Sequence, residues 1–171
     1  QNRERMDEGH RWDMLFPFAY AGFVALLLLQ LVARGHRWLA LAVPVALLII
    51  PFDLKENGVL LAITHALGNG ASIDLLLQQL HLATWLKWGA LGISIAALAI
   101  GLLAEKRHAC ALVSVIAALG VTVCWASGTK PVLAEAMSLT LFVFFLYFTV
   151  RSSIQAWRLL SKGRETHVSV H

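Results

Sequence analysis

Charged residues are scarce in this 171-residue chain: they occupy 14% of its positions, against about 25% in an average soluble domain. Hydrophobic residues make up 58% of the sequence, and the mean hydropathy is +0.70. This composition argues against an ordinary soluble domain and predicts a membrane protein. The net charge of +4 comes mostly from short connectors and the C-terminal tail, a distribution that indicates membrane orientation and no nucleic-acid partner.

Cysteines and recognisable catalytic motifs are also few. Cys110 and Cys124 fall in one apolar run, about 21 Å apart along a helix, which is too far for a disulfide, so we expect two small core residues. The sequence contains no G-x-S-x-G, P-loop or zinc pattern and indicates no particular cofactor. We interpret His65 and His81 as interfacial side chains rather than metal or haem ligands, and we predict no metal site.

What the chain does have is long apolar segments. A transmembrane helix needs roughly 20 apolar residues, and five segments reach or approach that length. We therefore predict a single all-α domain over residues 1–171, an integral membrane bundle of five transmembrane helices. The first segment is too long for a signal-peptide core and lacks a cleavage site, so we expect it to be retained. The predicted spans are residues 14–33, 39–67, 81–104, 109–127 and 132–151.

The second span has two possible interpretations because Pro51 interrupts its apolar run. If the helix ended at Pro51, it would contain about 12 residues, which is too few to cross a bilayer. If it continues to residue 67, the span is complete and Asp53, Glu56 and Asn57 lie inside it. We favour the longer helix, with Pro51 and Gly58 bracketing a kinked or locally unwound segment.

The basic connectors predict the orientation of the bundle. With five spans, the connector at Arg34 and Arg37, the connector at Lys106 and Arg107, and the basic C-terminal tail all fall on one side. Cytoplasmic connectors are enriched in lysine and arginine. The sequence therefore predicts an N-terminus outside and a C-terminus inside.

Ionisable residues within the spans mark the candidate site, since charges at membrane depth are costly, usually paired and often functional. Asp53, Glu56 and Asn57 have the spacing i, i+3 and i+4 and share one helix face. Lys87 on the third span lies at a matching depth, counted at 1.5 Å per residue. We predict that Lys87 pairs with Glu56 or Asp53 in the outer half of the membrane.

Other polar residues are expected to complete a pocket that opens outward. Asp13 and Tyr20 enter it from the first span, Trp88 adjoins Lys87, and His65 lines its mouth. Lys55 does not fit this picture because it lies about 200° round the helix from Asp53. It must extend toward the membrane surface, contact Glu135 or a backbone carbonyl, or indicate local unwinding.

Three short motifs carry a resemblance to a known family. They are Asp13-x-x-Phe16-Pro17-x-x-Tyr20, Asp53-x-x-Glu56-Asn57 and Thr84-x-Leu86-Lys87-Trp88. Over about residues 11–104 the chain resembles a family of small bacterial multi-pass membrane proteins of uncharacterised function. The resemblance implies a continuous second helix, polar positions at Asp13, Asp53, Glu56, Asn57 and Lys87, and a location in the bacterial cytoplasmic (inner) membrane. Lys55 stands where that family has a neutral residue, and the family implies no activity.

These residues support three hypotheses of function. In the first, the pocket binds an amphiphilic or lipid-like molecule and performs acid/base chemistry on it, with Glu56, Asp53 and Lys87 as catalytic residues and Asn57 and Tyr20 orienting the ligand. In the second, the charges are a structural ion pair in a non-catalytic subunit or assembly factor, within a homo-oligomer or a larger membrane complex. In the third, the chain is a small transporter or ion-conducting component, although the fourth and fifth spans offer no continuing chain of ionisable groups. Membrane lipids are partners in every case.

Overall fold

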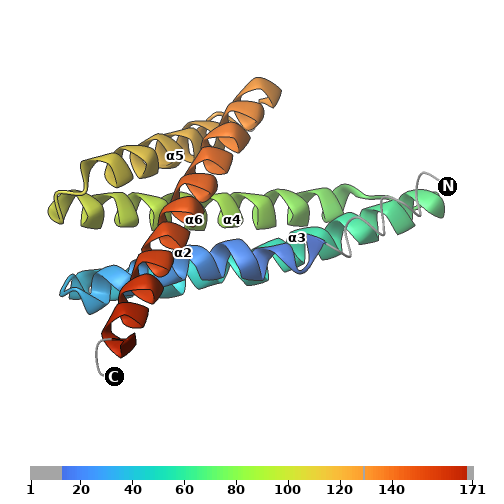
Figure 1. Ribbon diagram of the computed structural model, residues 1–171. Helices are drawn as coiled ribbons and strands as arrows, with labels where there is room; N and C mark the ends of the chain where they lie inside the picture. Colours follow the sequence, from blue (N-terminus) through green and yellow to red (C-terminus); the bar gives the residue numbers. More distant parts are fainter. Residues whose placement is uncertain (1–12, 129, 169–171) are drawn as a thin grey trace.

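The computed structural model describes residues 13–128 and 130–168, and every secondary-structure element in these ranges is helical (Figure 1). Five helices are long and apolar enough to cross a membrane, which confirms the predicted number of spans. The charged segment before residue 13 lies outside the described residues. The elements are α2 (Phe16–Ala33), the 3-10 helix η1 (Arg37–Leu41), α3 (Ala42–Gly68), α4 (Asp74–Ala104), α5 (His108–Ala126) and α6 (Pro131–Val168).

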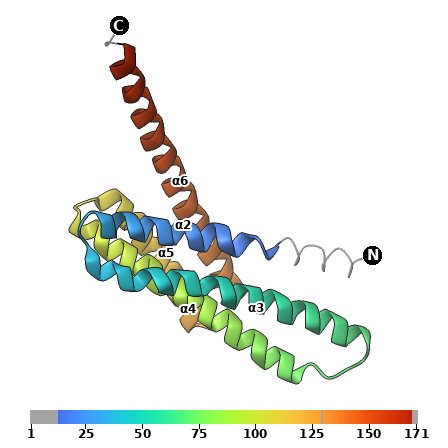
Figure 2. The same ribbon diagram turned by 90° about the horizontal axis from the view of Figure 1, so that it is seen from below.

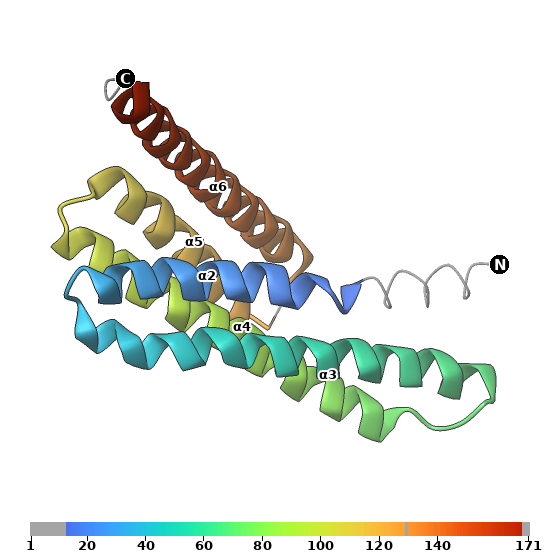
Figure 3. The ribbon, with the colours of Figure 1, turned by 60° about the horizontal axis from the view of Figure 1, so that its bottom comes forward.

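Helices α3 and α4 form a long antiparallel hairpin, which is the main structural unit of the bundle. Helix α2 lies along the half of this hairpin that adjoins η1, and the other ends of α3 and α4 extend beyond Phe16 (Figure 3). Helix α5 follows α4, whereas α6 crosses the other helices steeply and its C-terminal half leaves the bundle (Figure 2). The site described below lies where α2 begins beside the middle of α3.

The longer interpretation of the second span is confirmed, because helix α3 runs from Ala42 to Gly68. Of the two alternatives for residues 51–58, the locally unwound segment does not occur. Pro51 costs the helix one backbone hydrogen bond, which the remaining turns of α3 tolerate. The basic C-terminal tail is helical, because α6 continues beyond the predicted span to Val168.

The connectors after α2 and α4 lie at the same end of the bundle, as the alternation of five spans predicted. Each connector turns on a left-handed residue, Gly35 with φ of 107° and Lys106 with φ of 58°. The Arg34 Nη1 atom lies 2.9 Å from Glu105 Oε2 and joins the two connectors. The side of the membrane on which this end lies stays a prediction from the positive-inside rule.

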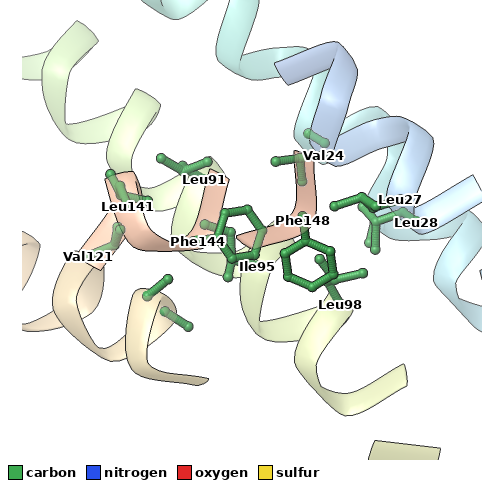
Figure 4. Packing of buried hydrophobic residues seen from close by; sticks show 14 of the residues in the cluster. Val24, Leu27, Leu28, Leu91, Ile95, Leu98, Val121, Leu141, Phe144 and Phe148 are labelled. Atoms are coloured by element: carbon green, nitrogen blue, oxygen red, sulfur yellow. The ribbon is translucent and has the colours of Figure 1, made fainter. Parts of the chain in front are cut away.

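Aromatic side chains hold α6 against the bundle. Phe144 and Phe148 are buried and point between α2 and α4, toward Leu28 and Ile95 (Figure 4). Lipid tails are as apolar as these side chains, so close packing rather than escape from water stabilises such a contact. Cys110 and Cys124 are buried and free, which confirms their predicted role as core residues.

We expect Phe144→Ala to destabilise the bundle more than Phe142→Ala. Phe144 is fully buried, whereas Phe142 is 63% exposed. Replacing a buried phenylalanine with alanine lowers the free energy of unfolding by about 3–5 kcal/mol in soluble proteins. In an apolar solvent this value is an upper bound. Thermal unfolding of the two variants in one detergent tests this, and equal melting temperatures would contradict the packing described for α6.

Candidate functional site

An ammonium group between two carboxylates forms the centre of the candidate site. Lys87 of α4 has its Nζ atom 3.2 Å from Asp53 Oδ1 and in contact with Glu56 Oε2, so it pairs with both acidic residues of α3. The three side chains are 11–14% exposed. The predicted pairing of Lys87 with Glu56 or Asp53 is confirmed, and it includes both partners.

Two hydroxyl groups satisfy the other carboxylate oxygens. Tyr20 of α2 donates a hydrogen bond of 2.6 Å to Asp53 Oδ2, and Thr84 of α4 donates one of 2.8 Å to Glu56 Oε1. Glu56 Oε2 accepts no hydrogen bond of normal geometry from the described residues and is balanced by the Lys87 ammonium. Each carboxylate is therefore held at both oxygens, and three helices are joined through the cluster.

The spacing along the chain explains why these side chains meet. Asp53 and Glu56 are three residues apart on one face of α3, close to the middle of that helix. Lys87 comes 13 residues after Asp74, and Glu56 comes 12 residues before Gly68, so both lie about 18–20 Å from the α3–α4 connector. Tyr20 reaches them from the second turn of α2.

A cavity of about 760 Å³ lies beside the cluster, between α2, α3, α4 and α6. This volume is within the range of about 300–1,000 Å³ typical of sites for small molecules. Most of its wall is apolar, and Phe16 and Phe142, which line it, are 66% and 63% exposed. Two exposed aromatic rings therefore border the opening of the cavity.

The cavity carries an excess of negative charge. Asp13, Asp53 and Glu56 line it together with one cation, Lys87, which both buried carboxylates already engage. Asn57 is buried and also lines the cavity, and its side-chain amide makes no hydrogen bond to a described residue. Asn57 is therefore a polar group free to bond a ligand, whereas Lys87 is not free to hold an anion.

All the predicted site residues except His65 lie together. Asp13 and Trp88 line the cavity, and the Lys87 Nζ atom lies 4.8 Å from the centroid of the Trp88 ring. His65 does not line it, contrary to our expectation, because it lies about 120° round α3 from Asp53 and is exposed beside Asn69. Lys55 is also exposed and pairs with no described residue, including Glu135.

Sequence reasoning missed the contribution of the last helix. Phe142 and Phe145 of α6 line the cavity, and the Phe145 ring packs edge-on against Tyr20 at 6.3 Å between centroids. Thr84, the hydroxyl donor to Glu56, stood in a quoted motif without an assigned role. Its spacing of three residues from Lys87, on the same face of α4, was the signal that could have identified it.

Comparisons with known proteins do not assign this site. No protein-family model, no curated protein and no solved structure matches the chain. The resemblance to the small bacterial membrane proteins therefore stays a prediction. Among the described residues, no group of three or more histidine, cysteine or acidic side chains is placed to hold a metal ion.

We expect Lys87→Met to destabilise the protein by about 3–5 kcal/mol, because it leaves two buried carboxylates without their counter-ion. Thermal or denaturant unfolding in detergent measures this, with Lys130→Met, at an exposed position, as the matched control. The triple variant Asp53→Asn, Glu56→Gln, Lys87→Met should recover much of the loss. A Lys87→Met protein as stable as the parent chain would contradict the role assigned to the ion pairs.

Proposed function

We propose that this chain binds an amphiphilic, lipid-like molecule in the cavity between α2, α3, α4 and α6. The observation that carries the proposal is the combination of an aromatic opening at Phe16 and Phe142 with a polar wall at Asp53, Glu56 and Asn57. An apolar chain would occupy the opening and a polar head group would meet the wall. A soluble polar ligand would not need the exposed phenylalanines, and a purely apolar one would leave Asn57 without a partner.

The charges of the wall favour a particular head group. Three carboxylates against one ammonium disfavour an anionic group and favour an amine or a neutral hydrogen-bond donor. Asn57 supplies both donors and an acceptor to such a group. Lys87 then has the role of holding the carboxylates in place rather than contacting the ligand's charge.

The same wall supports acid/base chemistry as an extension of binding. Asp53 and Glu56 both line the cavity and both have a neighbouring hydroxyl and ammonium, so either carboxylate is positioned to exchange a proton with a head group. Tyr20 fixes the orientation of Asp53, as Thr84 does for Glu56. We propose binding as the primary function and proton transfer as the chemistry that these residues would supply.

Quenching of Trp88 fluorescence tests the proposal. A brominated alkylamine, a brominated alkyl glucoside and a brominated fatty acid are titrated into the detergent-solubilised protein, and Trp88→Phe identifies the signal of the Trp88 ring. We expect the amine and the glucoside to quench the fluorescence of Trp88. The fatty acid should bind with an affinity at least about tenfold lower, which corresponds to about 1.4 kcal/mol of binding free energy. Equal quenching by all three probes, or no quenching of Trp88, would overturn the proposal.

Two variants with a matched control locate the binding in the cavity. Asn57→Leu removes the free amide without touching an ion pair, and Glu56→Gln removes one carboxylate; each should weaken amine binding by about tenfold. Glu135→Gln, an exposed position on α6, should leave it unchanged. Far-UV circular dichroism confirms folding of each variant, and a folded Asn57→Leu protein with unaltered affinity would contradict the site.

Lys55 favours a second candidate function, a subunit of a larger membrane complex. It lies 13 residues from each end of α3, about 20 Å along the helix, and is exposed without a partner among the described residues. An unpaired ammonium facing lipid at that depth is costly. A carboxylate or carbonyl from another membrane chain, or from a second copy of this one, would remove that cost.

The size of the protein in native membranes tests this second candidate. We expect the parent chain to migrate as a larger complex after mild solubilisation, and Lys55→Leu to migrate as a smaller species. Lys130→Leu is the control, because Lys130 is exposed near the start of α6 rather than in the middle of a span. Identical migration of Lys55→Leu and the parent chain would exclude a complex held at Lys55.

A further inference from the structure

Two opposite charges on the outside of the bundle lack a partner among the described residues. Lys55 is exposed on α3 and Glu135 is exposed on α6, and neither side chain makes an ion pair or a hydrogen bond with a residue that the structure describes. Glu135 is the only charged residue between Pro131 and Val150. Charges on apolar, membrane-spanning helices are usually paired, so both side chains indicate a contact with another molecule.

Lys55 and Glu135 lie at about the same level of the bundle. Lys87 of α4 pairs with the two carboxylates that flank Lys55 in α3. Trp125, near the end of α5, donates a hydrogen bond of 3.0 Å to the backbone carbonyl of Trp85, two residues before Lys87. The first turns of α6, which carry Glu135, follow this end of α5 and are level with the middle of α3 (Figure 1).

The two charges face away from the core on different sides of the molecule. Lys55 lies about 200° round α3 from Asp53, whose side chain points inward to Lys87. Glu135 lies about 160° round α6 from the buried Met137. Helix α4 lies between α3 and the first turns of α6 (Figure 1). An ion pair between Lys55 and Glu135 therefore requires two copies of the chain.

The face of α3 around Lys55 permits close approach of another helix. Pro51, Gly58 and Ala62 lie at positions i−4, i+3 and i+7 from Lys55, so they share its face, and all three are exposed. A side chain added at Gly58 would meet no other atom of the chain within 4 Å. Small residues let helices in lipid pack closely, so a neighbouring helix can reach the Lys55 ammonium.

The face of α6 around Glu135 has larger side chains. Val132 and Leu139 lie at positions i−3 and i+4 from Glu135, Leu146 continues the same face, and all three are exposed. None of the three lines the cavity beside Lys87. A bulky face with one carboxylate on α6 thus complements a low face with one ammonium on α3, in both shape and charge.

We propose that copies of this chain associate in the membrane through an ion pair between Lys55 of one copy and Glu135 of the next. Such a contact is heterologous, because α3 of one copy meets α6 of its neighbour, and its closed repetition gives a ring. Copies that share one membrane orientation can form a ring only if the paired residues lie at equal level, as these two do. The pairing rests on the second candidate function, a complex held at Lys55, and identifies the missing partner as a second copy.

Exchange of the two charges tests the pairing. Energy transfer between donor-labelled and acceptor-labelled copies in phosphatidylcholine liposomes measures association of the full chain. Lys55→Glu and Glu135→Lys should each weaken association at least about tenfold, because each variant places like charges opposite one another. The double variant carries both exchanged charges and should recover the association of the parent chain. Lys130→Glu, at an exposed position outside this contact, is the matched control and should leave association unchanged.

Mixed disulfide cross-linking tests the heterologous geometry. Copies with Lys55→Cys mixed with copies with Glu135→Cys should form a cross-linked dimer under oxidation, whereas each variant alone should not. The native Cys110 and Cys124 are buried and free, so the parent chain should give no cross-link and serves as the control. Far-UV circular dichroism establishes that each variant is folded. A cross-link formed by Lys55→Cys alone would show that two α3 helices meet instead, and would overturn the proposal.

The charge exchange also separates this proposal from the second candidate function. A double variant as dissociated as the two single variants would overturn the pairing of Lys55 with Glu135. If Lys55→Glu disrupts a complex in native membranes and Glu135→Lys does not, the partner is a different chain, so the pairing fails while the second candidate function stands. If neither variant alters association in liposomes or in native membranes, both fail.

Discussion

The contact of the Lys87 ammonium with Asp53 and Glu56 is the interaction on which the rest of the arrangement depends. Between helices in lipid there is no gain from escaping water, so packing and polar contacts decide how they associate. In that solvent a charge without a partner is costly, and a complete set of partners fixes one register of the helices. Lys87 fixes α4 against α3, and Tyr20, bonded to Asp53, fixes α2 against both.

A structural role for this cluster and a binding role are compatible. The inward contacts of Asp53 and Glu56 are satisfied by Lys87, Tyr20 and Thr84, which accounts for stability. The same carboxylates border the cavity, where the amide of Asn57 has no partner among the residues that the structure describes. A binding site requires polar groups that protein contacts hold rigidly on one side and that a ligand can reach on the other. The ligand then meets preorganised partners.

The spacing of residues along the helices predicted the ion pairs at the centre of the site. It did not predict the aromatic residues of α6 that line the cavity. The three-residue spacing of Asp53 and Glu56 and the depth of Lys87 were sufficient, because a helix has a fixed rise and a charge in lipid needs a partner. Pro51, Gly58 and Lys55 suggested local unwinding as one possibility, but α3 is continuous, and Lys55 projects from it without a partner among the described residues. The position of Phe145 was not predictable, since α6 is apolar on nearly all faces and its sequence does not show which face turns inward.

Charge is divided between two places that share one helix. Carboxylates are in excess in the cavity, where Phe145 of α6 contributes to the wall. Guanidinium groups gather at the other end of the bundle, where Phe148 and Arg151 of α6 line a small cleft together with Arg34 and Arg107. Three residues separate Phe145 from Phe148, and three more lead to Arg151, so consecutive turns of α6 serve both places. Aromatic side chains hold α6 to α2 and α4, so the same packed face of this helix fixes both the Phe145 wall of the cavity and the position of Arg151.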